Sequence, residues 1–135
     1  MQIYVGPIEE AIPALEQAIR LSPRDPGIGL WYFRIGQAHL LQSHIDQAIL
    51  WLERALRANA GLPGPHAYLA AAYALKGESE RAATELAEAR RLRGEDSWSS
   101  LARFRADTRY EAPTIRFLAE ATIFDGLRKA GMPEE

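Results

Sequence analysis

The sequence predicts an all-α fold, a solenoid of antiparallel helix hairpins closed by a C-terminal capping helix. Two observations favour this architecture. Small and apolar residues recur at helical spacing through most of the chain, and one stretch repeats itself 34 residues further on. The alternation of apolar and polar residues that is typical of a β-strand does not occur. With 135 residues, the chain has the length of one domain.

The repeated stretch is GQAHLLQSHIDQAILWLERAL, residues 36–56, which matches the sequence 34 residues later without a gap. Its polar interruption at 42–44 recurs at 76–78, and we therefore predict a turn between two helices at both places. Small residues at recurring positions would let the two helices of each hairpin approach closely. The identical pairs are Ala38 and Ala72, Leu41 and Leu75, Ala48 and Ala82, Leu52 and Leu86, Ala55 and Ala89, and Arg57 and Arg91.

A 34-residue period of helix, turn and helix resembles the tetratricopeptide repeat (TPR) family. One repeat matches the family pattern at Tyr32, Ile35, Gly36, His39, Ala48, Leu52 and Ala55, and the next matches it at Leu69, Ala70, Tyr73, Ala82, Leu86 and Ala89. Departures from the pattern are His66 for the first aromatic residue, His39 for the tyrosine and Ala60 for the closing proline. The resemblance implies TPR-type hairpins whose first helices line a concave face for a partner.

The segment before these repeats, EEAIPALEQAIRLSPRDP, matches the second helix of a repeat at an offset of 37 residues. MQIYV at 1–5 would then be the end of a first helix that begins before Met1. We therefore expect an excised C-terminal piece of a longer protein, or else a natural short protein with an atypical first helix. The predicted divisions are a partial repeat at 1–28, repeats at 29–62 and 63–96, and C-terminal helices at 97–135.

The C-terminal part departs from the repeat pattern after Asp96. We predict a short helix capped by Asp96 or Ser97, and then a longer helix that begins at Pro113 and stops at Gly131. The long helix could cap the last repeat, or it could lie in the concave groove as a built-in ligand. Its apolar stripe is predicted to contain Ile115, Leu118, Ala119, Thr122, Ile123, Leu127 and Ala130, widened by Phe117, Ala121 and Phe124.

This tail, APTIRFLAEATIFDGLRKAGMPEE, is also similar to segments that follow TPR arrays in bacterial multidomain regulators, especially class III adenylate or guanylate cyclases. The phrases EQAIRLSPRDP and LWYFRIGQAHLL add to that resemblance. It implies a sensor or scaffold attached to a cyclase or to a winged-helix regulator. Cyclase chemistry needs paired carboxylates on a sheet domain, and any such activity would lie outside these residues.

Carried over position by position, the TPR resemblance predicts a groove for an extended peptide or an amphipathic helix of another protein. The alternative is that Phe33, Leu40 and Tyr68 pack against neighbouring helices or against the C-terminal helix. The predicted groove residues are Leu30, Phe33, Arg34, Gln37, Leu40, Leu41, Ala67, Tyr68, Ala71, Ala74 and Leu75.

Composition excludes several classes of function. A net charge of -2, from 16 basic and 18 acidic residues, gives no electrostatic basis for binding nucleic acid. The longest apolar run is too short to span a membrane, and the absence of cysteine fits a reducing compartment such as the cytoplasm. We predict no metal site for His39, His44 and His66, no cofactor site and no catalytic group.

Three functions remain open from the sequence. The first is a module that binds a protein or peptide partner in its groove. The second is self-association, as a homodimer, through the N-terminal edge or the tryptophan-bearing faces. The third is allosteric control of an attached cyclase or winged-helix regulator.

Overall fold

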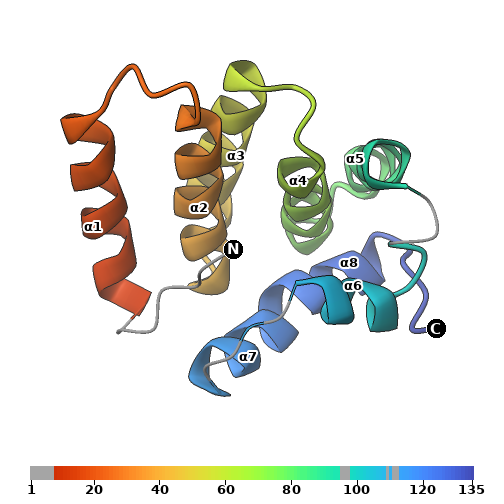
Figure 1. Cartoon of the computed structure of the whole chain (residues 1–135). Coiled ribbons are helices and arrows are strands. Elements are labelled where there is room, and N and C mark those ends of the chain that lie inside the picture. Colours follow the sequence, from red (N-terminus) through yellow and green to blue (C-terminus); the bar gives the residue numbers. More distant parts are fainter. Residues whose placement is uncertain (1–7, 95–97, 109, 111–112) are drawn as a thin grey trace.

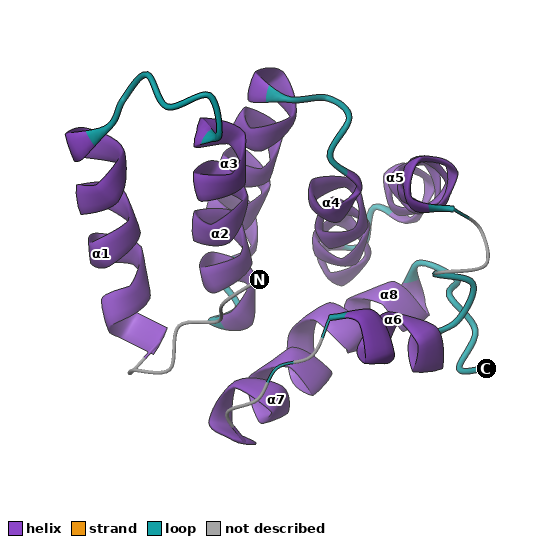
Figure 2. Ribbon diagram, in the orientation of Figure 1, coloured by secondary structure: helices purple, strands orange, loops and turns teal. Residues whose placement is uncertain are grey.

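The computed structural model describes residues 8–94, 98–108, 110 and 113–135, and in these residues it contains helices and loops without strands (Figure 2). The helices are α1 (Ile8–Leu21), α2 (Ile28–Leu41), α3 (Ile45–Ala58), α4 (Pro63–Lys76), α5 (Ser79–Arg93), α6 (Leu101–Asp107), α7 (Pro113–Ala119), the π-helical η1 (Glu120–Phe124) and α8 (Asp125–Lys129). The all-α prediction is confirmed. The segment MQIYV, predicted to end a first helix, lies outside the described residues.

Two helix hairpins form the centre of the molecule. Helix α2 packs against α3, α4 packs against α5, and α3 packs against α4 to join the hairpins. Helix α1 packs against α2, so α1 to α5 follow one another across the molecule (Figure 1). This is the solenoid of antiparallel hairpins that the sequence predicts.

Small residues set the close crossings within the hairpins, as expected. Ala48, Ala55, Ala82 and Ala89 have no exposed surface. At Gly36, an added Cβ atom would lie 2.7 Å from the Cγ atom of Leu52 on the facing helix. The positions that recur every 34 residues are therefore the contact points between helices, because larger side chains there would force the helices apart.

The turns of the two hairpins repeat each other in detail. Ser43 and Gly77, which are equivalent in the repeat, both have left-handed backbones, with φ of 64° and 91°. In both turns the next N–H donates back to the preceding helix, from His44 to the His39 carbonyl (2.8 Å) and from Glu78 to the Tyr73 carbonyl (2.9 Å). Both helices thus end in the same hydrogen-bonded turn, once with the glycine that this backbone favours and once with serine.

A second layer is formed by the C-terminal residues. Helices α7, η1 and α8 follow one another without a break, because the junction residues Ala119 and Asp125 keep helical backbone angles. We call residues 113–129 the C-terminal helix. It runs beneath the row of hairpins, with α6 beside it (Figure 1), and contacts α4 and α2, the first helices of the two repeats.

The structure corrects two details of the predicted C-terminal part. The cap of α6 is Ser100, whose Oγ accepts a hydrogen bond from the Arg103 N–H (3.2 Å), whereas the predicted caps Asp96 and Ser97 lie outside the described residues. Phe117 and Ala121 were predicted to widen the buried stripe, but both are exposed. Phe124 is buried as predicted, and the helix begins at Pro113 and turns at Gly131, which has a φ of 112°.

Candidate functional site

The predicted groove residues lie on α2 and α4, the first helices of the two hairpins, and most are covered. Only Leu30 is clearly exposed, with 41% of its surface accessible. The half-buried members are Arg34, Gln37, Ala74 and Leu75. The buried members are Phe33, Leu40, Leu41, Ala67, Tyr68 and Ala71.

The C-terminal helix covers this face at a very close crossing with α4. Gly126 of α8 lies against Ala71, and an added Cβ atom would be 2.5 Å from the Ala71 carbonyl oxygen and 2.7 Å from its Cα and Cβ atoms. No side chain fits between two backbones at that separation. The pair of small residues therefore determines how deeply the helix lies on the face.

A buried polar cluster joins the two layers beside this crossing. The Gln37 Nε2 group donates to the hydroxyl oxygens of Tyr68 (2.9 Å) and Tyr110 (2.8 Å), and the two hydroxyls are hydrogen-bonded to each other. Burial raises the pKa of Tyr68 to about 12 and raises the pKa of Tyr110 well above its ordinary value. Both tyrosines are therefore neutral hydrogen-bonding groups at physiological pH.

Aromatic rings continue the contact from the repeats into the C-terminal layer. Phe33 meets Tyr68 edge to face (5.1 Å between ring centroids), and Tyr68 lies 6.3 Å from Phe104 of α6. Phe104 in turn contacts Trp98 (5.0 Å) and Phe124 of the C-terminal helix (6.0 Å). Packing of Phe33 and Tyr68, the alternative left open by the sequence, is the arrangement in this structure.

Helix α6 and the C-terminal helix are linked to each other by an ion pair and by backbone hydrogen bonds. Arg105 forms a two-pronged ion pair with Glu120 through Nε and Nη2, both at 2.8 Å. The backbone after the C-terminal helix returns to α6, where the N–H groups of Leu101 and Ala102 donate to the carbonyls of Pro133 (2.8 Å) and Glu134 (3.0 Å). We call residues 98–135 the C-terminal unit, because these bonds connect its described helices directly.

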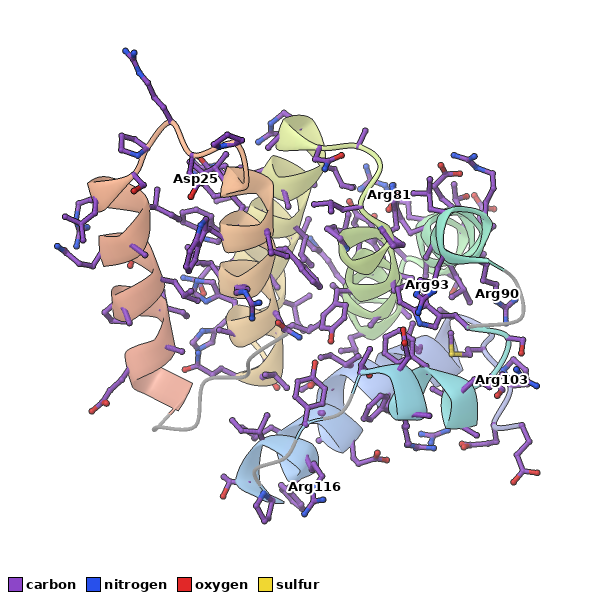
Figure 3. The ribbon with its side chains drawn as sticks, viewed as in Figure 1. Asp25, Arg81, Arg90, Arg93, Arg103 and Arg116 are labelled. Carbon is purple, nitrogen blue, oxygen red and sulfur yellow. The ribbon has the colours of Figure 1, made fainter. Side chains whose placement is uncertain are left out.

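The C-terminal unit also touches α5, at its start and along α6. Arg90 donates to the carbonyl oxygens of Trp98 and Ser99, both at 3.1 Å, and Arg93 pairs with Asp107. Figure 3 shows the side chains of Arg90 and Arg93 between α5 and the C-terminal layer. The Trp98 Nε1 group donates to the same carboxylate (2.8 Å). Burial by itself would raise the pKa of Asp107, but the hydrogen bonds from Arg93 and Trp98 outweigh it and hold that pKa below its usual value.

Sequence reasoning missed Tyr110 and Gly126, the residues that connect the C-terminal unit to the groove. Gly126 carried a usable signal, because a glycine inside an amphipathic helix often marks a close approach of two backbones. Tyr110 carried no such signal, because its hydroxyl is positioned by Gln37 of α2 and Tyr68 of α4, which are far away in the sequence. Among the described residues no three His, Cys, Asp or Glu side chains form a group that could hold a metal ion.

Comparison with known families supports the repeat assignment. The family model described as tetratricopeptide repeat matches residues 32–61, which extend from the second turn of α2 past the end of α3. These residues form a tetratricopeptide repeat, a unit that generally mediates protein–protein interaction. No curated protein matches the chain. None of the helices in the described ranges combines the length and the apolar character needed to cross a bilayer.

Proposed function

We propose that this chain is a protein-interaction module that binds an amphipathic helix of another protein on the face formed by α2 and α4. One observation carries the proposal: this face already holds an amphipathic helix, the chain's own, with Gly126 in contact with Ala71. A surface that accepts one helix at backbone contact has the shape and apolar character that recognition of a helix requires. The module would work by docking, without chemistry of its own.

The presence of a tetratricopeptide repeat at 32–61 supports this class of function. The face also has the composition of a recognition surface, with the aromatic side chains of Phe33 and Tyr68 surrounded by small ones. Exposed Leu30 and half-buried Arg34 continue the face at the N-terminal half of α2. A bound helix could therefore contact more of α2 than the C-terminal helix does.

Selection of amphipathic helical peptides from a display library against the full chain tests the proposal. Selected peptides should perturb the NMR amide signals of α2 and α4. Leu30→Asp should weaken their binding about tenfold or more, since a charge would enter an apolar contact. Leu50→Asp on α3 is the matched control, because Leu50 is similarly exposed (48%) but lies on a second helix. Perturbations confined to α3 and α5 would contradict the proposed face.

Self-association remains a second candidate, and exposed apolar side chains favour it. Leu21 and Phe117 are each 74% exposed, at the end of α1 and on α7. Such residues can join two copies of a chain, although single exposed apolar residues are common on monomers. Light scattering over a dilution series tests the candidate, and a monomer at every concentration would exclude it.

The link to a cyclase or winged-helix regulator rests on the similarity of residues 112–135 and of the two phrases quoted above. Under this proposal the module would be a regulatory part of a larger bacterial signalling protein. The coding sequence next to this segment tests it, because a parent gene with neither domain would remove the proposal. The cytoplasmic location likewise remains a prediction from the lack of cysteine, and the net charge of -2 still argues against a nucleic-acid partner.

A further inference from the structure

We infer that the C-terminal helix is an exchangeable occupant of the α2–α4 face, and that a partner helix binds by taking its place. This inference rests on the function proposed above and adds its regulation. The module would be closed in the absence of a partner, and the affinity measured for any partner would include the work of displacing residues 113–129.

The seated helix indicates what kind of partner can replace it. Gly126 is the point of closest approach to α4, so a competing helix needs glycine there, or must lie further out. Ile123 and Leu127 flank this point and are fully buried, whereas Glu120 and Arg128 are exposed. The partner is therefore an amphipathic helix with one small residue between apolar residues on the same face, and with charges on the opposite face.

The two hairpins contain packing contacts of their own, which should keep them folded when the C-terminal helix is displaced. Leu52 and Leu86 are buried, and the recurring alanines hold α2 against α3 and α4 against α5. These contacts join helices of the hairpins, and the same hydrophobic core continues into Leu101 and Leu127 of the C-terminal unit. Removal of the C-terminal helix would uncover Ala71 and Tyr68 but would leave the helix crossings of both repeats unchanged.

The C-terminal unit can also leave as one body. The Arg105–Glu120 pair and the two backbone bonds to Pro133 and Glu134 lie within the unit and need not break. Among the polar contacts that must break are the Gln37–Tyr68–Tyr110 cluster, the partly buried hydrogen bonds from Arg90 to the Trp98 and Ser99 carbonyls, and the Arg93–Asp107 ion pair. Surface ion pairs such as Arg93–Asp107 add little to stability, so the polar cluster, the Arg90 hydrogen bonds and the apolar contact hold the unit closed.

Opening of the C-terminal unit without a partner is unfavourable, so a partner helix must take the place of the C-terminal helix. An empty face would expose the apolar surface of Ala71, Tyr68, Ile123 and Leu127 to water. The open form is then a minor population, and a partner's apparent affinity is its intrinsic affinity multiplied by that small fraction. A substitution that weakens the seating of the C-terminal helix should raise the partner's affinity by enlarging the open fraction.

The experiment uses a fluorescent synthetic peptide of residues 113–132 as the probe and the full chain as the receptor. Gly126→Leu in the chain would place side-chain atoms against the Ala71 backbone and so loosen the internal helix. This variant should bind the probe about tenfold more tightly or better than the wild-type chain does. Ala121→Leu is the matched control, because it also adds a leucine to the C-terminal helix but at an exposed position, and it should leave the affinity within about twofold.

Equal probe affinity for the wild type and the Gly126→Leu chain would overturn the inference. If library peptides nevertheless bound on α2 and α4, the proposed function would stand and only the exchange would fall. Absence of any peptide binding to that face would remove both. Unfolding of α2 to α5 together with the C-terminal helix in the Gly126→Leu chain would show that the helix is an integral part of the fold, and this too would overturn the exchange.

Hydrogen exchange on the wild-type chain gives a measurement that needs no variant. If the C-terminal unit opens, its helices lose the packing that stabilises them, and the slowest amides of residues 113–129 should exchange at least tenfold faster than those of α3 and α4. Adding a peptide selected on the α2–α4 face should accelerate exchange in 113–129 further. Protection of the C-terminal helix equal to that of α3, and unchanged by the peptide, would contradict the inference.

Discussion

Gly36 and Leu52 are in contact across the hairpin formed by α2 and α3, with no room for a side chain at position 36. An added Cβ atom would lie 2.7 Å from the Leu52 Cγ atom and 3.2 Å from the Leu52 backbone nitrogen. Gly36→Leu should therefore lower the free energy of unfolding by about 1–3 kcal/mol, or more if α2 must move away from α3. Urea unfolding measures this effect.

Gly61 provides the comparison for this prediction, because it lies in the loop between α3 and α4. A Cβ atom there would meet only the Asn59 side chain, at an ordinary 3.4 Å. Gly61→Ala should change the free energy of unfolding by no more than about 0.5 kcal/mol. Equal effects at the two glycines would mean that Gly36 does not set the crossing.

Ser43 offers a stabilising substitution. Its φ of 64° is costly for a residue with a Cβ atom, and its repeat equivalent is glycine. Ser43→Gly should raise the free energy of unfolding by up to about 1 kcal/mol, the gain being limited by the greater freedom of glycine in the unfolded chain. The reverse change, Gly77→Ser, should lower it by about 1 kcal/mol. Destabilisation by Ser43→Gly would show that the serine side chain has a favourable role in the turn.

The buried tyrosine pair predicts a loss of stability in alkaline solution. An unfolded tyrosine ionises near pH 10, whereas burial raises the pKa of Tyr68 to about 12. A raised folded-state pKa contributes stability that is complete below pH 10 and is lost as the pH rises towards 12. Urea midpoints between pH 9 and 11.5 should fall, and Tyr68→Phe should reduce this slope.

Tyr32→Phe is the control for the alkaline experiment, because Tyr32 is only half-buried and packs on Trp51. The Tyr32→Phe chain should retain the wild-type slope. The Tyr68→Phe chain should also be less stable at neutral pH by about 1–3 kcal/mol, since Gln37 and Tyr110 would lose a hydrogen-bond partner. A wild-type slope in both variants would contradict the prediction.

The lowered pKa of His39 predicts a loss of stability in mildly acidic solution. Burial lowers its pKa, the nearby His44 lowers it further, and Glu16 partly opposes both. The folded protein therefore resists protonation of His39, and the stability present above about pH 6.5 is lost as the pH falls through the lowered folded-state pKa. The Nδ1 atoms of His39 and His44 lie 3.2 Å apart, within hydrogen-bond distance.

Thermal unfolding between pH 5 and 7.5 measures this effect. His39→Gln should flatten the acid side of the profile because the buried titrating group is gone. His66→Gln removes the histidine paired with Glu85 but keeps His39. This control variant should therefore lose thermal stability in mild acid as the wild-type chain does. A profile unchanged by His39→Gln would exclude His39 as the cause.

The repeats were predictable because their constraints are local and occur twice. Ala48 and Ala82 mark the same crossing, and the turns at Ser43 and Gly77 follow from the same interruption of the helical pattern. The sequence placed the predicted groove on α2 and α4, and it left open whether the C-terminal helix would cap the last repeat or lie in this groove. Its occupation depends on contacts such as Gly126 with Ala71, which join residues far apart in the sequence and leave no periodic trace.

The buried face of the C-terminal helix was misjudged for a different reason. Ile115, Ala119, Ile123 and Leu127 are all buried and follow one another at intervals of four residues. On a regular α-helix such a series drifts by about 120° from first to last, whereas Phe117 and Ala121 lie about 200° beyond Ile115 and Ala119, on the opposite side of the helix, so they did not belong in the predicted stripe. The π-helical turn from Glu120 to Phe124 takes up an extra residue, which keeps Leu127 in line with Ile115 and brings Phe124 onto the buried face.

This π-helical turn means that the C-terminal helix is one residue longer than its contacts require. Removal of Ala121 would space the four buried side chains at four, three and four residues, the spacing that suits an uninterrupted α-helix. The shortened chain should therefore fold and melt close to the wild type, whereas deletion of the equally exposed Ala83 would shift Leu86 and Ala89 out of place. We therefore expect the helix that lies on the α2–α4 face to tolerate the deletion of one residue, which the helices of the repeats should not.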